Sequence, residues 1–360
     1  MDTTELFFVG TYTQKEGHVP KGCGEGIVAY ILDKKTGNLL KKSVSSSMVN
    51  PSFVHYDSKK QKLYAMEEIT HDDPESAFLI AYDVDQSNGE LTEASRVNAR
   101  VVAGAHVNMH GNNVIVAAYG SGNILAYETN DGHLGRKGMH QYVGTGPNKQ
   151  RQEAPHAHQA TISPNGKFMY VCDLGTDTIW VHSTHNLPEI KPPIHGIPTP
   201  PGSGPRHLVF HPTLPFVYAI MELSGIILTF TFDPDNGLLD VVNEVNSLPV
   251  EYQEVPASAG IRMHPTGNAI YVSNRTHNSI GIFPLVEGKI DSNLASWVPC
   301  GGECPRDFAI DSSGKFLICG NQDENTLTVF KIEAPNLIDS KYATYPCNTP
   351  SCIAFGVVNP

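Results

Sequence analysis

The sequence has little positive charge and no extended apolar run. Its 360 residues include 25 Lys and Arg against 37 Asp and Glu, which gives a formal net charge of −12. Proteins that bind nucleic acid need a concentrated basic surface, so nucleic acid is not expected as a partner. Apolar residues make up 40% of the chain and charged residues 17%, which is typical of a soluble globular protein with a substantial core. No stretch is apolar enough to span a membrane, and no membrane partner is expected.

Several short motifs are also missing. The first ten residues lack the basic start and apolar run of a secretory signal, which predicts a cytoplasmic location. The closest cysteine pairs, Cys300 with Cys304 and Cys347 with Cys352, do not have the spacing of a zinc ribbon. The seven cysteines are therefore expected to be reduced thiols. The chain contains no G-x-S-x-G elbow, no H-E-x-x-H pair and no phosphate-binding P-loop.

What the sequence does contain is a repeat of about fifty residues. The fullest copy has apolar segments at 204–212, 216–222 and 226–233, followed by an Asp-x-x-x-Gly turn that ends at Gly237. No stretch indicates a long helix. Three or four strands per repeat at this spacing are typical of a β-propeller blade. Other copies begin near residues 50, 105, 155, 260 and 305.

Six complete repeats and one divided between the chain ends predict seven blades. Residues 348–355 resemble an innermost strand, and residues 6–10 and 26–33 resemble further strands of the same blade. Pairing these segments would close the ring and leave no open sheet edge at the join. We therefore predict an all-β fold, a single seven-bladed propeller domain over residues 1–360, closed by pairing of the N- and C-terminal strands.

Antiparallel strands return to the rim from which they start, so the first residues of first strands and the last residues of second strands should meet at one mouth of the channel. Polar side chains concentrate at these positions. Among them, Arg206, Arg275 and Arg306 suggest a small anionic ligand, because guanidinium groups pair with carboxylate or phosphate. Salt bridges with neighbouring acids are the alternative. The full set is His106, His156, His158, Asp173, Arg206, His207, Glu222, Asn274, Arg275, Arg306, Asp307, Asn321 and Gln322.

Three of these positions suggest acid–base or ligand chemistry. Glu222 follows an apolar strand, where burial would raise the pKa of its carboxyl group and a neighbouring arginine would lower it, and in either case it is a candidate acid or base. His156 and His158 flank one alanine and would share a face of a strand. Two ligands are too few for a metal, and no third is indicated, so no metal or other cofactor is expected.

At these residues the sequence resembles the propeller lactonase family, which includes bacterial-type 6-phosphogluconolactonases and fungal 3-carboxy-cis,cis-muconate lactonizing enzymes. The resemblance spans the chain and is most specific at residues 151–158, 173–177 and 204–207. It implies a seven-bladed propeller and a metal-free active site. The catalytic residues that it implies are His156, Arg206, Glu222 and Arg275. From the polar positions at the same mouth we predict His158, Asp173, His207, Asn274 and Arg306 as further substrate contacts.

The function predicted from this resemblance is hydrolysis of 6-phospho-D-glucono-1,5-lactone to 6-phosphogluconate in the pentose phosphate pathway. Arg206 and Arg275 would hold the anion and stabilise the oxyanion, while Glu222 or His156 would take a proton from water. The alternatives are a muconate-cyclising enzyme that uses the same arginines and a non-catalytic binding scaffold. The expected partner is a small anionic lactone or carboxylate, and the expected assembly is a monomer or weak homo-oligomer.

Overall fold

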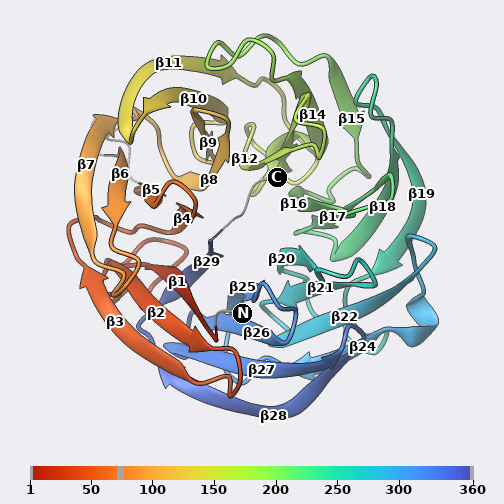
Figure 1. Cartoon of the computed structure of the whole chain (residues 1–360). Helices are drawn as coiled ribbons and strands as arrows, with labels where there is room; N and C mark the ends of the chain where they lie inside the picture. The colour runs from red at the N-terminus through yellow and green to blue at the C-terminus, as the bar shows by residue number, and fades with distance from the viewer. Residues whose placement is uncertain (1–2, 71–76, 357–360) are drawn as a thin grey trace.

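The computed structural model describes residues 3–70 and 77–356, and it shows seven antiparallel sheets arranged in a ring (Figure 1). Among these residues the strands are interrupted by only two short 3-10 helices, η1 (Leu174–Thr176) and η2 (Ser292–Leu294). The predicted all-β, seven-bladed propeller is therefore confirmed. A search of the same residues for a helix of membrane-spanning length and hydropathy finds none.

The two ends of the chain meet in one blade, as the sequence predicted. This closing blade has the order β29 (Pro350–Phe355), β1 (Thr4–Thr11), β2 (Ile27–Asp33) and β3 (Leu39–Ser45). Val9 of β1 lies opposite Ile353 of β29 in antiparallel register. The ring is therefore closed by a hydrogen-bonded ladder between residues more than 300 positions apart in sequence.

The other six blades follow one another along the chain, with the innermost strand first. Blades are named here by that innermost strand. Their strands are β4 (Phe53–Asp57), β5 (Lys62–Met66), β6 (Phe78–Val84) and β7 (Leu91–Asn98); β8 (Gly104–His110), β9 (Asn113–Ala118), β10 (Asn123–Asn130) and β11 (His133–Gln141); β12 (Ala157–Ile162), β13 (Phe168–Asp173), β14 (Thr178–Ser183) and β15 (His195–Pro198); β16 (Pro205–Phe210), β17 (Phe216–Met221), β18 (Ile226–Phe232) and β19 (Leu239–Asn246); β20 (Ser258–Met263), β21 (Ala269–Asn274), β22 (Ser279–Val286), β23 (Lys289–Ile290) and β24 (Ser296–Pro299); and β25 (Pro305–Ile310), β26 (Phe316–Asn321), β27 (Thr326–Ala334) and β28 (Leu337–Pro346).

The hydrophobic core lies between the blades. In the described residues, seven apolar clusters each join two neighbouring blades, as where Tyr170 of β13 and Val217 of β17 belong to one cluster. Because both faces of a blade are covered in this way, its second strand is mostly apolar, and β13 is buried along its whole length. The outermost β3 is instead half-buried or exposed.

The Asp-x-x-x-Gly turn fastens neighbouring blades to each other. Gly237 donates its N–H to the carbonyl of Asp233 and has φ +80°, a conformation that favours glycine. A Cβ atom at Gly237 would lie 2.9 Å from the ring of Phe168 in the preceding blade. The hydroxyl of Tyr170 donates a hydrogen bond to the carbonyl of Gly237 at 2.7 Å. The turn is therefore a packing and hydrogen-bonding contact that holds the ring in register.

Candidate active site

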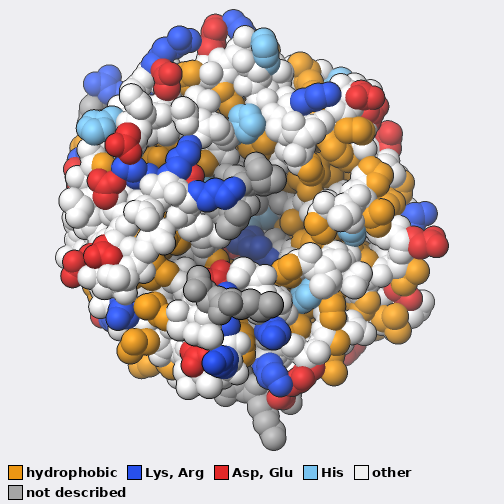
Figure 2. Space-filling model, viewed as in Figure 1, with side chains coloured by type: hydrophobic (Ala, Val, Ile, Leu, Met, Phe, Trp, Pro, Cys, Tyr) orange, Lys and Arg blue, Asp and Glu red, His pale blue; other side chains and the backbone are white. Residues whose placement is uncertain are grey.

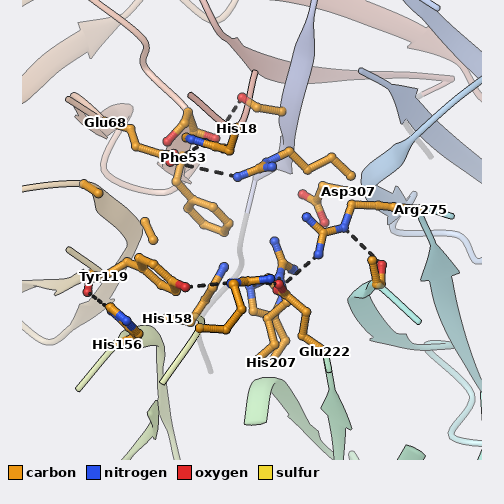
Figure 3. A pocket seen from close by; sticks show the side chains of 18 of the residues that line it. His18, Phe53, Glu68, Tyr119, His156, His158, His207, Glu222, Arg275 and Asp307 are labelled. Atoms are coloured by element: carbon orange, nitrogen blue, oxygen red, sulfur yellow. Dashed lines mark hydrogen bonds and ion pairs between the residues drawn. The ribbon is translucent and has the colours of Figure 1, made fainter. Parts of the chain in front are cut away.

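A cavity of about 670 Å³ opens at one mouth of the central channel, and residues from all seven blades line it. Figure 2 shows basic side chains at the bottom of a hollow in the centre of the ring. Figure 3 shows the lining side chains from close by. The cavity brings together seven of the nine predicted site residues, whose chemical roles stay predictions: His156, His158, Arg206, His207, Glu222, Arg275 and Arg306.

A β-bulge at the start of several innermost strands presents side chains to this cavity. In β16, Pro205 and His207 pair with consecutive residues of β17, so that Arg206 between them has no partner. A bulge of this kind releases one residue from the ladder and redirects its side chain. The unpaired residues of five blades all line the cavity, namely Ala105, His158, Arg206, Arg306 and Ser351.

A second recurring position lies just after the second strand of a blade. Glu222 follows β17, Arg275 follows β21, and Tyr119 follows β9, and all three line the cavity. The last residue of the strand itself is turned away from the cavity, as where Met221 of β17 and Ala118 of β9 pack in the apolar clusters. The two positions, bulge and strand exit, explain why side chains far apart in sequence meet at one mouth.

Three arginines surround the carboxylate of Glu222. Arg206 Nε lies 2.9 Å and Arg275 Nη2 lies 3.1 Å from Oε2, while Arg151 Nη2 lies 2.6 Å from Oε1. The side chains of Arg206 and Glu222 are 3% and 4% exposed, so water screens this cluster poorly. The salt-bridge alternative thus holds for Arg206 and Arg275, yet three cations share a single carboxylate. The cluster therefore carries surplus positive charge.

The pKa values reflect this surplus. Burial alone would raise the pKa of Glu222, but the charges of Arg275, Arg206 and Arg151 hold it well below its usual value. Burial and the charge of Arg275 lower the pKa of Arg206 to about 9, because Glu222 compensates them only in part. An additional anion beside Arg206 would relieve this repulsion.

Three histidine rings pack near the arginines. His207 lies edge-on to His158 at 5.1 Å and to His106 at 6.0 Å between ring centroids. The Nδ1 atoms of all three have no hydrogen-bond partner in the part of the chain that the structure describes. Burial and the charge of Arg206 lower the pKa of His158 well below its usual value, so the ring is neutral at neutral pH. His106 lies behind Phe53 and does not line the cavity.

His156 has a different environment. Its ring stacks on Tyr119 with centroids 4.3 Å apart. Nδ1 lies 3.0 Å from the carbonyl oxygen of Tyr119, and Nε2 lies 3.1 Å from the carboxylate of Glu153. Both ring nitrogens of His156 therefore lie at hydrogen-bond distance from acceptor oxygens.

Asp173 and Asn274, which were predicted to contact substrate, do not line the cavity. The carboxylate of Asp173 accepts the backbone N–H of His156 at 2.7 Å. Asn274 accepts a hydrogen bond from Ser258 at 2.8 Å and donates one to the carbonyl of Ser247 at 2.9 Å. Both end a second strand and point to neighbouring loops, so their roles are structural. Asn321 and Gln322, also expected at this mouth, likewise lie outside the lining.

Sequence reasoning missed several lining residues, including Tyr119, Arg151, Glu68 and His18. Tyr119 occupies the same strand-exit position as Glu222, a signal that the repeat alignment contains. Arg151 and Glu68 lie in loops, and their contacts depend on how those loops fold. His18 belongs to the excursion between β1 and β2, which has no counterpart in the repeat and therefore gave no signal.

No cluster of three or more His, Cys, Asp or Glu side chains in residues 3–70 and 77–356 is arranged to hold a metal ion. His156 and His158, the pair considered for this role, have their rings in separate environments: one stacks on Tyr119 and the other contacts His207.

Residues 6–355 match the protein family described as "Lactonase, 7-bladed beta-propeller". The chain is 29% identical to the 6-phosphogluconolactonase of Bacillus subtilis (strain 168), and the match covers 91% of each chain. It is 30% identical to a 6-phosphogluconolactonase of Formosa agariphila over 90% of this chain and 91% of the relative. Among solved structures, the periplasmic gluconolactonase of Pseudomonas aeruginosa is similar with a TM-score of 0.87, 25% identity and 99% coverage of both chains.

Proposed function

Because the chain belongs to the seven-bladed propeller family of lactonases, we propose that it hydrolyses 6-phospho-D-glucono-1,5-lactone to 6-phosphogluconate. One observation carries this proposal: Arg151, Arg206 and Arg275 share the single carboxylate of Glu222. A cluster in which three arginines share one buried carboxylate favours an anionic substrate. Two relatives that carry the name 6-phosphogluconolactonase support a phosphorylated lactone.

The arginines would act on the substrate in two ways. Their guanidinium groups bind phosphate through paired N–H donors. They also stabilise the negative charge that develops on the carbonyl oxygen when water adds to the lactone, because that charge forms in a poorly screened site. Since Arg206 is buried and already held in place by Glu222, little reorganisation is needed.

His158 is the better candidate for the base. The oxygens of Glu222 face guanidinium groups, and both ring nitrogens of His156 face acceptors. His158 borders the cavity as a neutral ring, and a neutral imidazole keeps one unprotonated nitrogen that can accept a proton. Binding of an anion would offset the charge of Arg206, which is one cause of the lowered pKa of His158, and would thus make the ring a stronger base.

The proposed reaction balances without a metal or cofactor. Water attacks the lactone carbonyl, and its proton passes to His158. The bond between the carbonyl carbon and the ring oxygen then breaks, and the proton returns to that oxygen as it becomes the free hydroxyl of 6-phosphogluconate. The net change is the addition of one water.

The test is the loss of phospholactone in the presence of purified protein, measured above its spontaneous hydrolysis and with chelator added. We expect catalysis that chelator does not reduce. Muconate cyclisation is the competing activity and is followed by loss of the diene's ultraviolet absorbance. Diene loss without phospholactonase activity would replace the proposal by cyclisation. The absence of both activities, together with a stoichiometric protein partner, would favour a binding scaffold.

The cytoplasm is the proposed compartment. All seven cysteines are free thiols, which suits a reducing environment. The Pseudomonas aeruginosa relative is described as periplasmic, so fractionation of the source cells is the direct test. We expect the protein with cytosolic markers, and a periplasmic fraction would overturn this assignment.

A further inference from the structure

A second buried carboxylate, Glu68, lines the cavity away from the arginine cluster. It lies in the loop after β5, in the β4 blade, whereas Glu222 belongs to the β16 blade. Figure 3 shows the two carboxylates on different sides of the cavity, with Glu68 beside His18. The side chain of Glu68 is 8% exposed. Neither the arginine cluster nor the proposed proton transfer uses it.

Two side chains contact Glu68 at hydrogen-bond distance, and one arginine lies farther away. The hydroxyl of Tyr12 donates to Oε2 at 2.7 Å, and Nε2 of His18 lies 3.0 Å from Oε1. Arg306 Nη2 lies 4.0 Å away, beyond hydrogen-bond distance. Burial would raise the pKa of Glu68, but the bond from His18 and the charge of Arg306 lower it to about 2, so the group is ionised at neutral pH.

An ionised carboxylate has about four acceptor positions, and Tyr12 and His18 occupy two of those on Glu68. Because Glu68 lines the cavity, its remaining acceptor positions are available to a molecule bound there. Arg306 is the arginine that faces Glu68, and its blade adds two carboxylates, Asp307 and Asp323, to the lining. Arg306 is also held 5.0 Å over the ring of Tyr12 and 3.3 Å from Gln322 Oε1. This side therefore has no surplus charge for a second anion.

We propose that Glu68 determines specificity by accepting hydrogen bonds from substrate hydroxyl groups and by repelling additional carboxylates. The inference rests on the proposed function, in which the substrate is a phosphorylated sugar lactone. The phosphate would bind the surplus arginines, and the hydroxylated ring would reach Glu68. A hydroxyl-free polycarboxylate would place a negative group against an ionised one, which costs free energy in a poorly screened site.

The test is a binding cycle that needs no turnover. Calorimetry measures glucose 6-phosphate, its single-deoxy analogues and inorganic phosphate against the wild-type protein, Glu68→Gln, Glu68→Asp and the control Glu25→Gln. For at least one of the single-deoxy analogues, binding to the wild-type protein should be weaker than that of glucose 6-phosphate, on the order of 10- to 100-fold. In Glu68→Gln the loss for that hydroxyl should fall to about 2-fold, with phosphate affinity unchanged. Glu25→Gln should match the wild type.

Two further measurements keep the inference testable if Glu68→Gln unfolds. Glu68→Asp keeps the charge but shortens the side chain, so it should lose affinity for the sugar ring and still exclude tricarballylate, a hydroxyl-free tricarboxylate. The deoxy series on the wild type stands alone: losses below about 2-fold at every hydroxyl would overturn the inference. If removal of a hydroxyl group weakens binding but the protein has no lactonase activity, the proposed reaction is rejected and the role of Glu68 is retained. If the protein is a lactonase but no hydroxyl group contributes to binding, the reaction is retained and the role of Glu68 is rejected.

Discussion

Glu222 and Glu68 are two buried carboxylates at one cavity, and their surroundings differ. Glu222 faces three guanidinium groups within 3.1 Å. Glu68 faces a phenol and an imidazole at close range, with one guanidinium group 4.0 Å away. Both are held ionised, the first by full positive charges and the second largely by a hydrogen bond.

The difference shows that a buried acid can serve opposite purposes. The carboxylate of Glu222 is outnumbered by three arginines. It orients their guanidinium groups, which remain available to bind an anion. Beside Glu68 one arginine faces the carboxylate, which itself remains available as an acceptor. The cavity therefore has an anion-binding side and a hydroxyl-binding side, which suits one molecule that carries both kinds of group.

The largest effect is expected at the anion-binding side. Arg206→Ala removes a buried cation that contacts Glu222, so kcat/KM for the phospholactone should fall by about 10³-fold. Steady-state kinetics measure this loss. Arg96→Ala, which removes a surface arginine paired with Glu93, is the control and should leave kcat/KM unchanged. An Arg206→Ala enzyme with wild-type kinetics would remove Arg206 from the mechanism.

The second-largest effect is expected for His158→Asn. Loss of a general base typically costs 10²- to 10⁴-fold, and we expect a fall in kcat of about 10²-fold with KM little changed. His156→Asn should have a smaller effect, within about 10-fold, because both nitrogens of His156 already face acceptors. Comparison of the two kcat values checks the assignment. A larger loss in His156→Asn would return the role of base to His156.

Glu222→Gln tests the charge balance through stability. It leaves three arginines without their carboxylate, so the free energy of unfolding should fall by about 3 kcal/mol. Since the folded pKa of Glu222 lies below its usual value of 4.5, its contribution is present above that pH and is lost as the pH falls through the folded value. Denaturant titrations at pH 7 and below 4.5 should show a smaller difference between the two proteins at the lower pH. An equal difference at both would contradict the lowered pKa.

The smallest effect is expected at an exposed ion pair. Lys41 Nζ lies 2.5 Å from Glu25 Oε2, but the two side chains are 44% and 42% exposed. Glu25→Gln should therefore change the free energy of unfolding by less than about 0.5 kcal/mol. The same denaturant titrations measure it. A loss as large as that of Glu222→Gln would show that burial does not separate the two carboxylates.

Much of this fold could be predicted from the sequence because the repeat is a local signal. Apolar second strands and the Asp-x-x-x-Gly turn recur at a fixed spacing, and the split blade follows from counting them. The site was less predictable. A shift of one residue at the strand end decides which side chain enters the cavity, so a simple alternation pattern cannot tell Glu222, which follows β17, from Asp173, which ends β13. Glu68 and His18 depend on loop conformations that no repeat position specifies.

The most direct test of the central claim compares the phosphorylated substrate with its uncharged counterpart. The ratio of kcat/KM for 6-phospho-D-glucono-1,5-lactone to that for glucono-1,5-lactone measures what the phosphate contributes. If surplus arginine charge binds the phosphate, this ratio should be about 100 or more and should approach one in Arg206→Ala. Equal kcat/KM values for the two lactones in the wild-type protein would contradict the account.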